Sequence, residues 1–270
     1  MQRREFLVFA LAGFLAKRGF ASDPAREFLR RVNEASRDLL AQHAQWQEAV
    51  EAAARAVDLA DLRRSIEFDK LAPPLAQHDT QGGNSVLLKG VGVSCAAKLF
   101  CLRKGDAITP HGHRNMMSMH LVLGGELHVR HFEKLGDDRA SVPAKDGLAP
   151  AGGHLLLRPT IDRTARPGDA TSVSPARDNV HWFVAQSRTA YTFDCIVSDL
   201  APAGYSYGID LVDPAGAERL PDGMLRAGVF LGLGGDHMDK RTHLRSPSHG
   251  VRGACHPARG PDVASVTQRA

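Results

Sequence analysis

The chain has 270 residues, of which 43% are hydrophobic and 24% charged, a composition that suits one large globular core or two small ones. The net charge of +4 comes from the two ends, 1–21 and 236–270, and the body between them is slightly acidic. A nucleic-acid-binding domain needs a basic face on its folded body, so this charge distribution argues against nucleic acid as a partner.

The N-terminus has the pattern of an export signal. Arg3-Arg4 precede an apolar stretch over 6–16 that is too short to span a bilayer, and Lys17-Arg18 then precede a small-residue cleavage site at Ala21. Basic residues at this place are typical of twin-arginine signals. We therefore expect 1–21 to be a signal peptide that directs an already folded protein to the periplasm. The alternative is a short amphipathic segment on a cytoplasmic protein.

The four cysteines do not form a disulfide framework. Cys95 and Cys101 are separated by about 20 Å if they lie on one strand, and a disulfide needs Cα atoms within about 7 Å. Cys195 could meet Cys101 across a sheet, whereas Cys255 lies in the C-terminal tail. The periplasmic prediction therefore depends on the signal alone.

Helical periodicity is confined to an N-terminal segment, 22–72. Asp23-Pro24 is a helix start, because an N-cap residue is followed by proline at the first helical position. A second helix is expected over 47–56 and a short third helix over 58–64. We expect Pro73-Pro74 to end this helical segment.

A region of short strands follows, and we expect it to form one β-domain over 73–235. The predicted strands are 86–93, 95–102, 107–113, 119–123, 126–132, 154–157, 171–174, 180–186 and 191–198, with 224–233 as a last strand that closes an edge. Eight or more short strands at this spacing are typical of a sandwich or barrel. The segment 236–270 is rich in Arg, Gly, Ser and Pro without periodicity and is expected to be a disordered tail.

Three histidines in this region suggest a metal site. His111 and His113 are two residues apart on a predicted strand, so their side chains share one face. His181 begins another apolar strand and can supply a third ligand. Neutral imidazoles suit Fe(II), Zn, Cu or Ni, and three protein ligands leave open positions, as catalytic metal sites do.

The expected fourth ligand is missing. The double-stranded β-helix proteins called cupins usually have a glutamate four or five residues after the second histidine. Those positions are Met117 and Ser118 in this chain, and Glu126 lies too far along to replace it.

The segments around the three histidines resemble the thiol dioxygenases of the cysteamine dioxygenase and plant cysteine oxidase family. The resemblance runs from Phe100-Cys-Leu-Arg through Thr109-Pro-His-Gly-His113 to 123–132, and continues in Asn179-Val-His-Trp-Phe-Val-Ala185 and 190–196. The helices over 26–62 are also similar. The resemblance implies a mostly β fold, the cupin double-stranded β-helix (a jelly-roll-like barrel), with N-terminal helices.

The same resemblance implies a chemistry and a set of roles. His111, His113 and His181 would hold Fe(2+), and Asp194 would be a buried carboxylate supporting the site, with a structural role at a strand end as an equal alternative. The reaction would convert a thiol, either a small aminothiol or a protein N-terminal cysteine, to a sulfinic acid with O₂. We expect a monomer without a stable membrane span.

The chain departs from the family on the substrate side of the pocket. Arg114-Asn115 stand where the family has Pro-Gly, and 201–207 replaces a Pro-Pro-Tyr stretch. Tyr205 is the candidate catalytic residue of that segment, together with Tyr207, and loop packing is the alternative for both. The family's next conserved neighbourhood is not recognisable over 209–214. His120, His128 and His131 are expected on the surface or in packing roles.

Three hypotheses follow for the function. The first is an iron-dependent thiol dioxygenase. The second is a metal-binding cupin without redox chemistry, acting as a sensor, a carrier, a hydrolase or an isomerase. The third is a structural β-barrel in which the histidines bind nothing.

Overall fold

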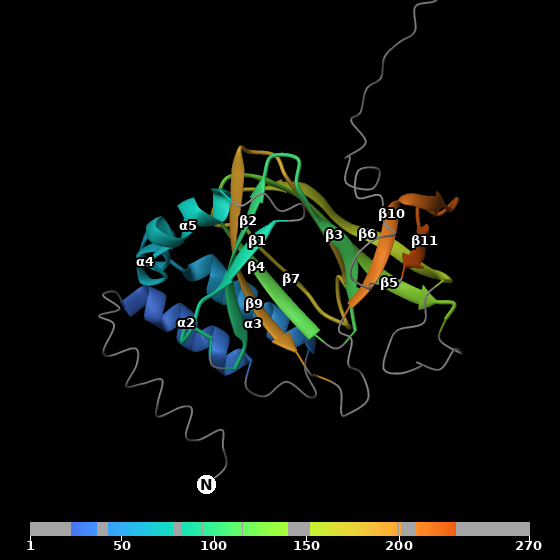
Figure 1. Cartoon of the computed structure of the whole chain (residues 1–270). Coiled ribbons are helices and arrows are strands. Elements are labelled where there is room, and N and C mark those ends of the chain that lie inside the picture. The colour runs from blue at the N-terminus through green and yellow to red at the C-terminus, as the bar shows by residue number, and fades with distance from the viewer. Residues whose placement is uncertain are drawn as a thin grey trace, which may run out of the picture.

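The structure is a computed structural model and describes residues 23–36, 43–77, 83–92, 94–114, 116–139, 152–198, 200 and 209–230. The predicted signal peptide over 1–21, the candidates Tyr205 and Tyr207, and the predicted tail over 236–270 lie outside the described residues. Helices come first along the chain and strands follow (Figure 1). No helix in the described part of the chain is long and apolar enough to cross a membrane.

Four helices are described: α2 (Asp23–Ala35), α3 (His43–Ala56), α4 (Leu59–Ser65) and α5 (Phe68–Gln77). The three predicted helices are present, and α3 begins four residues earlier than expected. The prediction that Pro73-Pro74 ends the helical segment is wrong, because both prolines lie inside α5, which crosses the boundary expected after residue 72. The prolines cannot donate to the carbonyls of Asp69 and Lys70, but all four residues are exposed, where water can bond free carbonyls.

Eleven strands follow in the described residues: β1 (Asn84–Leu87), β2 (Ala96–Arg103), β3 (Ala107–His113), β4 (Met116–Gly124), β5 (Leu127–Asp137), β6 (His154–Ala165), β7 (Ala170–Val173), β8 (Val180–Ala185), β9 (Thr189–Ser198), β10 (Ile209–Arg219) and β11 (Leu225–Phe230). One sheet has the order β1-β2-β9-β4-β7, and the others close a barrel in the order β10-β11-β6-β5-β8-β3. We call these sheet A and sheet B.

The order of the strands identifies the fold. From β2 to β5 the chain alternates between sheet A and sheet B, and from β6 to β9 it alternates back in the reverse order. This winding places β2-β9-β4-β7 against β3-β8-β5-β6 with antiparallel neighbours, which is the jelly roll or double-stranded β-helix. The mostly β cupin fold with N-terminal helices is therefore confirmed.

One strand was not predicted. β10 contains Pro214 and Gly216, which are typical of turns, and its pairing with β11 shifts register between Asp213 and Glu218. Because the bulge absorbs these residues, the strand continues through a sequence that indicates a loop. β11 pairs with β10 and β6, so the predicted last strand does close an edge.

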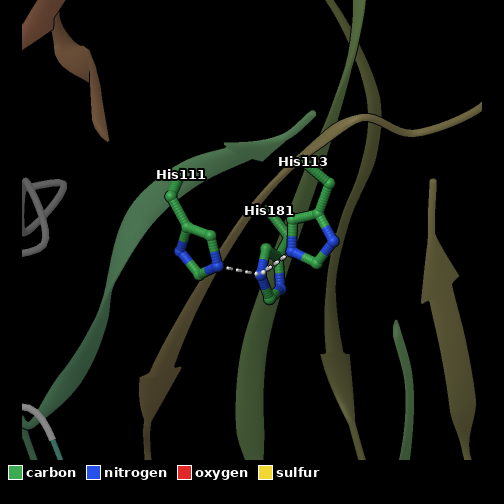
Figure 2. Close-up of side chains that lie close together, drawn as sticks. All are labelled: His111, His113 and His181. Atoms are coloured by element: carbon green, nitrogen blue, oxygen red, sulfur yellow. Dashed lines mark hydrogen bonds between the residues drawn. The ribbon is translucent and has the colours of Figure 1, made fainter. Parts of the chain in front are cut away.

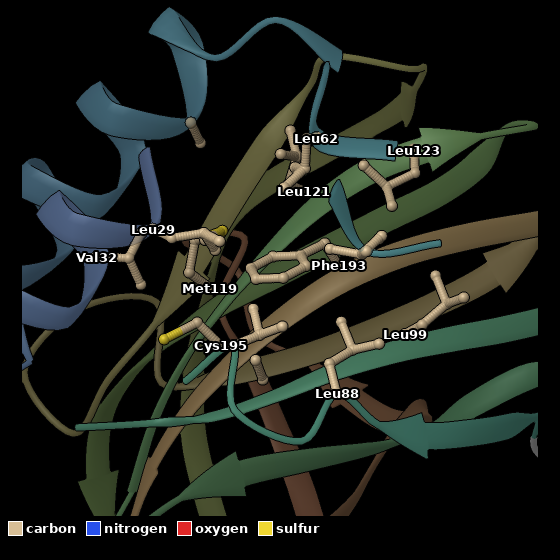
Figure 3. Close-up of a cluster of buried hydrophobic side chains, with 14 of the residues drawn as sticks. Leu29, Val32, Leu62, Leu88, Leu99, Met119, Leu121, Leu123, Phe193 and Cys195 are labelled. Atoms are coloured by element: carbon tan, nitrogen blue, oxygen red, sulfur yellow. The ribbon is translucent and has the colours of Figure 1, made fainter. Parts of the chain in front are cut away.

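The helices cover the outer face of sheet A (Figures 1 and 3). Side chains from the helices and from alternate sheet positions form one buried core there, among them Phe28, Leu29, Val32, Leu62, Leu99, Met119, Leu121, Leu123 and Phe193. On β4 the odd-numbered residues Met117 and Met119 belong to this core, so Ser118 and His120 face the barrel interior. Every residue from Met117 to Leu123 is buried, because β4 has a core on each face.

The pairing of β2 with β9 answers the question about the cysteines. Cys101 lies opposite Tyr191, whereas Cys195 lies opposite Ala97, so the two cysteines do not meet. Cys95, Cys101 and Cys195 are all free thiols. The pKa of the Cys195 thiol is raised well above its usual value, mainly by burial and to a smaller extent by the neighbouring Cys95 side chain.

Candidate metal centre

Two paired strands of sheet B bring the three predicted ligands together. His111 lies opposite His181 in the pairing of β3 with β8, and His113 is two residues further along the same face of β3. Gly112 stands between the two β3 histidines at a close approach. A Cβ atom there would lie 2.7 Å from Asn179 Oδ1 and 3.2 Å from Val180 Cγ2. The glycine therefore allows the ligand-bearing end of β3 to approach β8 closely.

The three imidazoles converge through their Nε2 atoms (Figure 2). His181 Nε2 lies 2.9 Å from His111 Nε2 and 3.3 Å from His113 Nε2. A metal with ligands at about 2.1 Å separates neighbouring ligand nitrogens by about 3.0 Å in octahedral geometry and about 3.4 Å in tetrahedral geometry. The spacing of the side chains thus fits a metal ion bound by all three.

The protonation state also favours a metal. Burial lowers the pKa of His111 to about 4, and it lowers the pKa values of His113 and His181 well below the usual value. All three imidazoles are therefore neutral at pH 7, as metal binding requires. The Nδ1–H of His111 can donate to the carbonyl of Thr109 at 2.7 Å, which leaves Nε2 free to bind a metal.

A carboxylate ligand is absent from this group. Among the described residues, the cluster of possible metal ligands consists of His111, His113 and His181. Of the two positions where a cupin glutamate is expected, Met117 is 0% exposed in the helix-facing core, whereas Ser118 is 2% exposed and faces the barrel interior. Ser118 is therefore the position that stands in place of the carboxylate.

Asp194, the predicted supporting carboxylate, makes no hydrogen bond or ion pair with the three ligands and contacts a different histidine. It is 3% exposed on β9, and its Oδ1 lies 3.2 Å from Nδ1 of His120. His120 is 5% exposed and its ring stacks on His181. The structure thus places Asp194 behind a fourth histidine that the sequence pattern did not single out.

Of the three histidines expected on the surface or in packing roles, two lie inside the barrel. His131 is 0% exposed, and it lies opposite His181 in the pairing of β5 with β8. His128 is on the other face of β5 and contacts Asp162 at 2.5 Å. Strand parity places His128 and His131 on opposite faces of β5 and His120 on the face of Ser118, but it does not indicate which of these faces points inward.

Arg114, one of the departures from the family pattern next to the ligands, belongs to a partly buried ion-pair cluster. Arg114 Nε lies 2.7 Å from Asp210 Oδ2, and Arg139, which is 4% exposed, contacts both Asp210 and Asp137. Asp210 lies opposite Gly112 on β3. The segment 209–214 that was not recognisable in the sequence is thus part of β10, and the cluster ties that strand to the end of β3.

One comparison with known proteins gives a match that spans this site. Residues 92–202 match the PCO_ADO family model, and the match contains His111, His113 and His181. Among curated proteins, none matches the chain.

The solved structures that resemble the chain are distant. A recombinant oxalate oxidase in complex with glycolate has a TM-score of 0.32 and 16% identity, and the match covers 46% of this chain and 54% of that one. KdgF from Halomonas sp. has a TM-score of 0.29 and 19% identity, covering 46% of this chain and 85% of that one. Procruciferin, an 11S globulin from Brassica napus, has a TM-score of 0.32 and 16% identity, covering 50% of this chain and 32% of that one.

The chain spans about half the length of the oxalate oxidase, at 54%. The family match is more specific, because it includes the strands that carry the three histidines and ends beyond Asp194. Over residues 92–202, the chain therefore resembles the PCO_ADO family, the family of cysteamine dioxygenase and plant cysteine oxidases.

Proposed function

We propose that the protein is an iron-dependent thiol dioxygenase. The observation that carries the proposal is the convergence of three neutral imidazoles without a carboxylate, inside the segment that matches the family. The net reaction converts RSH and O₂ to RSO₂H, so both oxygen atoms end on sulfur and no other reductant is consumed. Iron(II) held by the three histidines would supply the binding of the thiolate and the activation of O₂.

The residues of the chain contribute through charge and shape. Three neutral ligands leave the full 2+ charge of a divalent ion uncompensated, which favours an anionic thiolate as the substrate group. Ser118 has no carboxylate to bind the ion, so the coordination position that a glutamate would fill stays open to another ligand. The apolar side chain of Phe183, which is 1% exposed and lies two residues after His181, limits water on the inner side of the site.

We further propose a small aminothiol or a protein N-terminal cysteine as the substrate. The test loads the purified chain with Fe(II) and follows O₂ consumption with cysteamine, cysteine and a peptide that begins with cysteine. The expected product carries two added oxygen atoms on sulfur, visible by mass spectrometry. His181→Ala is the matched control and should consume no O₂. An absence of O₂ uptake by the iron-loaded protein with every thiol would refute the proposal.

A metal-binding cupin without redox chemistry is the second candidate. The 3.3 Å separation of His113 Nε2 from His181 Nε2 also fits tetrahedral geometry, which zinc prefers. Elemental analysis of the protein from its native host distinguishes the two candidates. Zinc or copper at full occupancy, with no thiol turnover after iron loading, would favour the second.

The cellular compartment of the protein is a separate proposal. The twin-arginine pattern over 1–21 supports export to the periplasm. Fusion of 1–21 to a reporter that works only after export tests it, with Arg3-Arg4 replaced by Lys-Lys as the control. Export of both fusions, or of neither, would contradict a twin-arginine signal.

A further inference from the structure

The ring of His181 lacks the support that metal-binding histidines usually have. Such histidines donate their second nitrogen to a carboxylate, a carbonyl or water, which fixes the plane of the ring. His111 has this support from the carbonyl of Thr109, at 2.7 Å from Nδ1. Nδ1 of His181 is buried and finds no hydrogen-bond partner among the described residues. Another contact must therefore orient this ligand.

Two aromatic side chains enclose the His181 ring instead. His120 stacks on it, with ring centroids 4.9 Å apart and an interplanar angle of 26°. Phe183 meets it edge-on at 4.9 Å and 86°, and meets His120 edge-on at 4.9 Å and 88°. Phe183 is two residues from His181 on the same strand, whereas His120 comes from the opposite sheet. His120 is therefore the contact across the barrel that limits rotation of the His181 ring.

His120 is itself held from both sides of its ring. Ser118 Oγ lies 2.9 Å from Nε2, and Asp194 Oδ1 lies 3.2 Å from Nδ1. Asp194 faces His120 directly in the pairing of β4 with β9, and Ser118 is two residues back on β4. All three residues are at most 5% exposed. The contact with Asp194 is an attraction between the carboxylate and the ring N–H rather than a well-aligned hydrogen bond.

The set of groups has the composition of a Ser–His–Asp nucleophile triad, but its placement does not suit that chemistry. Ser118 is 2% exposed and Asp194 is 3% exposed, so an acyl group has no approach to the hydroxyl. A nucleophile must meet its substrate at a distance of about 3 Å. The arrangement suits support of a neighbouring group instead.

We propose that His120 is a positioning residue for the metal ligand His181. Ser118 and Asp194 fix the His120 ring, and the His120 ring fixes the plane of His181, in place of a protein acceptor for its Nδ1–H. Asp194 thus acts on the site through His120. The inference rests on metal binding by the three histidines and not on the reaction that follows.

The test measures Co²⁺ binding to the metal-free full chain by its visible absorption spectrum, which reports both affinity and ligand geometry. His120→Leu is compared with His131→Leu, the same substitution at another buried histidine of the interior. His131 has no hydrogen bond to either nitrogen among the described residues, and its ring lies 6.2 Å from that of His181 at 88°. His120→Leu should weaken Co²⁺ binding by about 10- to 100-fold and alter the spectrum, as loss of a ligand's support does. His131→Leu should retain both.

A second variant keeps the test decisive if His120→Leu does not fold. Asp194→Asn conserves the shape of the side chain and removes its charge, so Co²⁺ binding should weaken in the same direction and by less. The inference is overturned if the folded His120→Leu protein binds Co²⁺ with wild-type affinity. If His120→Leu does not fold, wild-type Co²⁺ affinity in Asp194→Asn overturns it. Equal losses in His120→Leu and His131→Leu overturn it as well, because they indicate general packing.

These outcomes are distinct from failure of the proposed function. A wild-type protein that binds Co²⁺ but oxidises no thiol refutes the dioxygenase and leaves the comparison of variants intact. A wild-type protein that binds no Co²⁺ refutes both.

Discussion

The two ends of the barrel interior share strands β4, β5 and β8 and differ in chemistry. The apolar end contains Leu102, Val122, Leu127, Val129, Ala165, Phe183, Ala185 and Ala190. The histidine end contains His111, His113, His120, His131 and His181. On β8 the change occurs between His181 and Phe183, and on β5 it occurs between Val129 and His131. A step of two residues along a strand therefore separates the hydrophobic core from the candidate site.

The difference shows where stability and function reside in this fold. A fully buried aliphatic or aromatic side chain at the apolar end contributes about 1.5–3 kcal/mol to folding. The histidine end buries imidazole nitrogens, and both nitrogens of His131 have no hydrogen-bond partner among the described residues. An unpaired buried polar group costs about 1–3 kcal/mol. The site thus depends on stability supplied by the rest of the barrel and by the helices on sheet A.

The strongest test of this division is His181→Ala at the histidine end. Loss of a ligand should weaken metal binding by more than about 100-fold, since loss of a ligand's support alone costs up to that amount. The substitution removes no part of the apolar end, so the unfolding transition of the metal-free protein should move little. Metal titration and thermal unfolding of the same preparation measure the two effects. Retained metal affinity would exclude His181 from the site.

The reciprocal change is Leu127→Ala at the apolar end. Leu127 is 1% exposed, and a buried Leu→Ala substitution costs about 2–5 kcal/mol. The metal affinity of the folded variant should stay at the wild-type value, because Leu127 lies four residues along β5 from His131. Urea denaturation gives the free energy of unfolding, and Co²⁺ titration gives the affinity. A large loss of affinity here would show that the two ends are coupled.

Ser118→Glu should convert the open site to one with a fourth ligand. Ser118 faces the interior, so we expect a glutamate there to bind the metal and fill an open position. The substitution also removes the contact of Ser118 with His120, but a new carboxylate ligand outweighs this loss, so we expect tighter metal binding and slower O₂ consumption. The gain should be about tenfold, equivalent to about 1.4 kcal/mol. Met117→Glu is the matched control, because Met117 is 0% exposed in the helix-facing core. Met117→Glu should destabilise the fold without tightening metal binding. Tighter metal binding in Met117→Glu but not in Ser118→Glu would show that Met117, and not Ser118, faces the metal.

His131→Leu should extend the apolar end into the histidine end with the smallest effect. Replacement of an unpaired buried polar group by an apolar one is neutral or stabilising at pH 7. Burial lowers the pKa of His131 to about 3 from 6.5, so between these values the unfolded chain binds a proton that the folded chain does not. Wild-type stability therefore falls as pH decreases through this range, by up to about 1.4 kcal/mol per pH unit for each such group. The His131→Leu variant should lose less stability between pH 7 and pH 5 than the wild type does. Urea denaturation of the metal-free proteins at the two pH values measures this difference. An unchanged pH dependence would show that His131 is not neutral in the fold.

The local features of the site could be predicted from the sequence. A period of two places His111 and His113 on one face of β3, and that strand has the predicted bounds. Most other strands were also expected, but β1 ends six residues earlier than predicted and β6 ends eight residues later. β10 could not be expected, because Pro214 and Gly216 indicate a turn and only a bulge in its pairing with β11 keeps them in the strand.

The sequence by itself determined which residues alternate along each strand, the histidine pair on β3, and the absence of a glutamate near it. Tertiary structure decided the rest, because strand register and the choice of face depend on what packs against the sheet. The helices take the face of β4 that carries Met117 and Met119, which turns Ser118 and His120 inward. The pairing of β3 with β8 sets His181 opposite His111. These long-range contacts join residues that no local pattern connects, which is why His120 became visible as part of the site only in the folded chain.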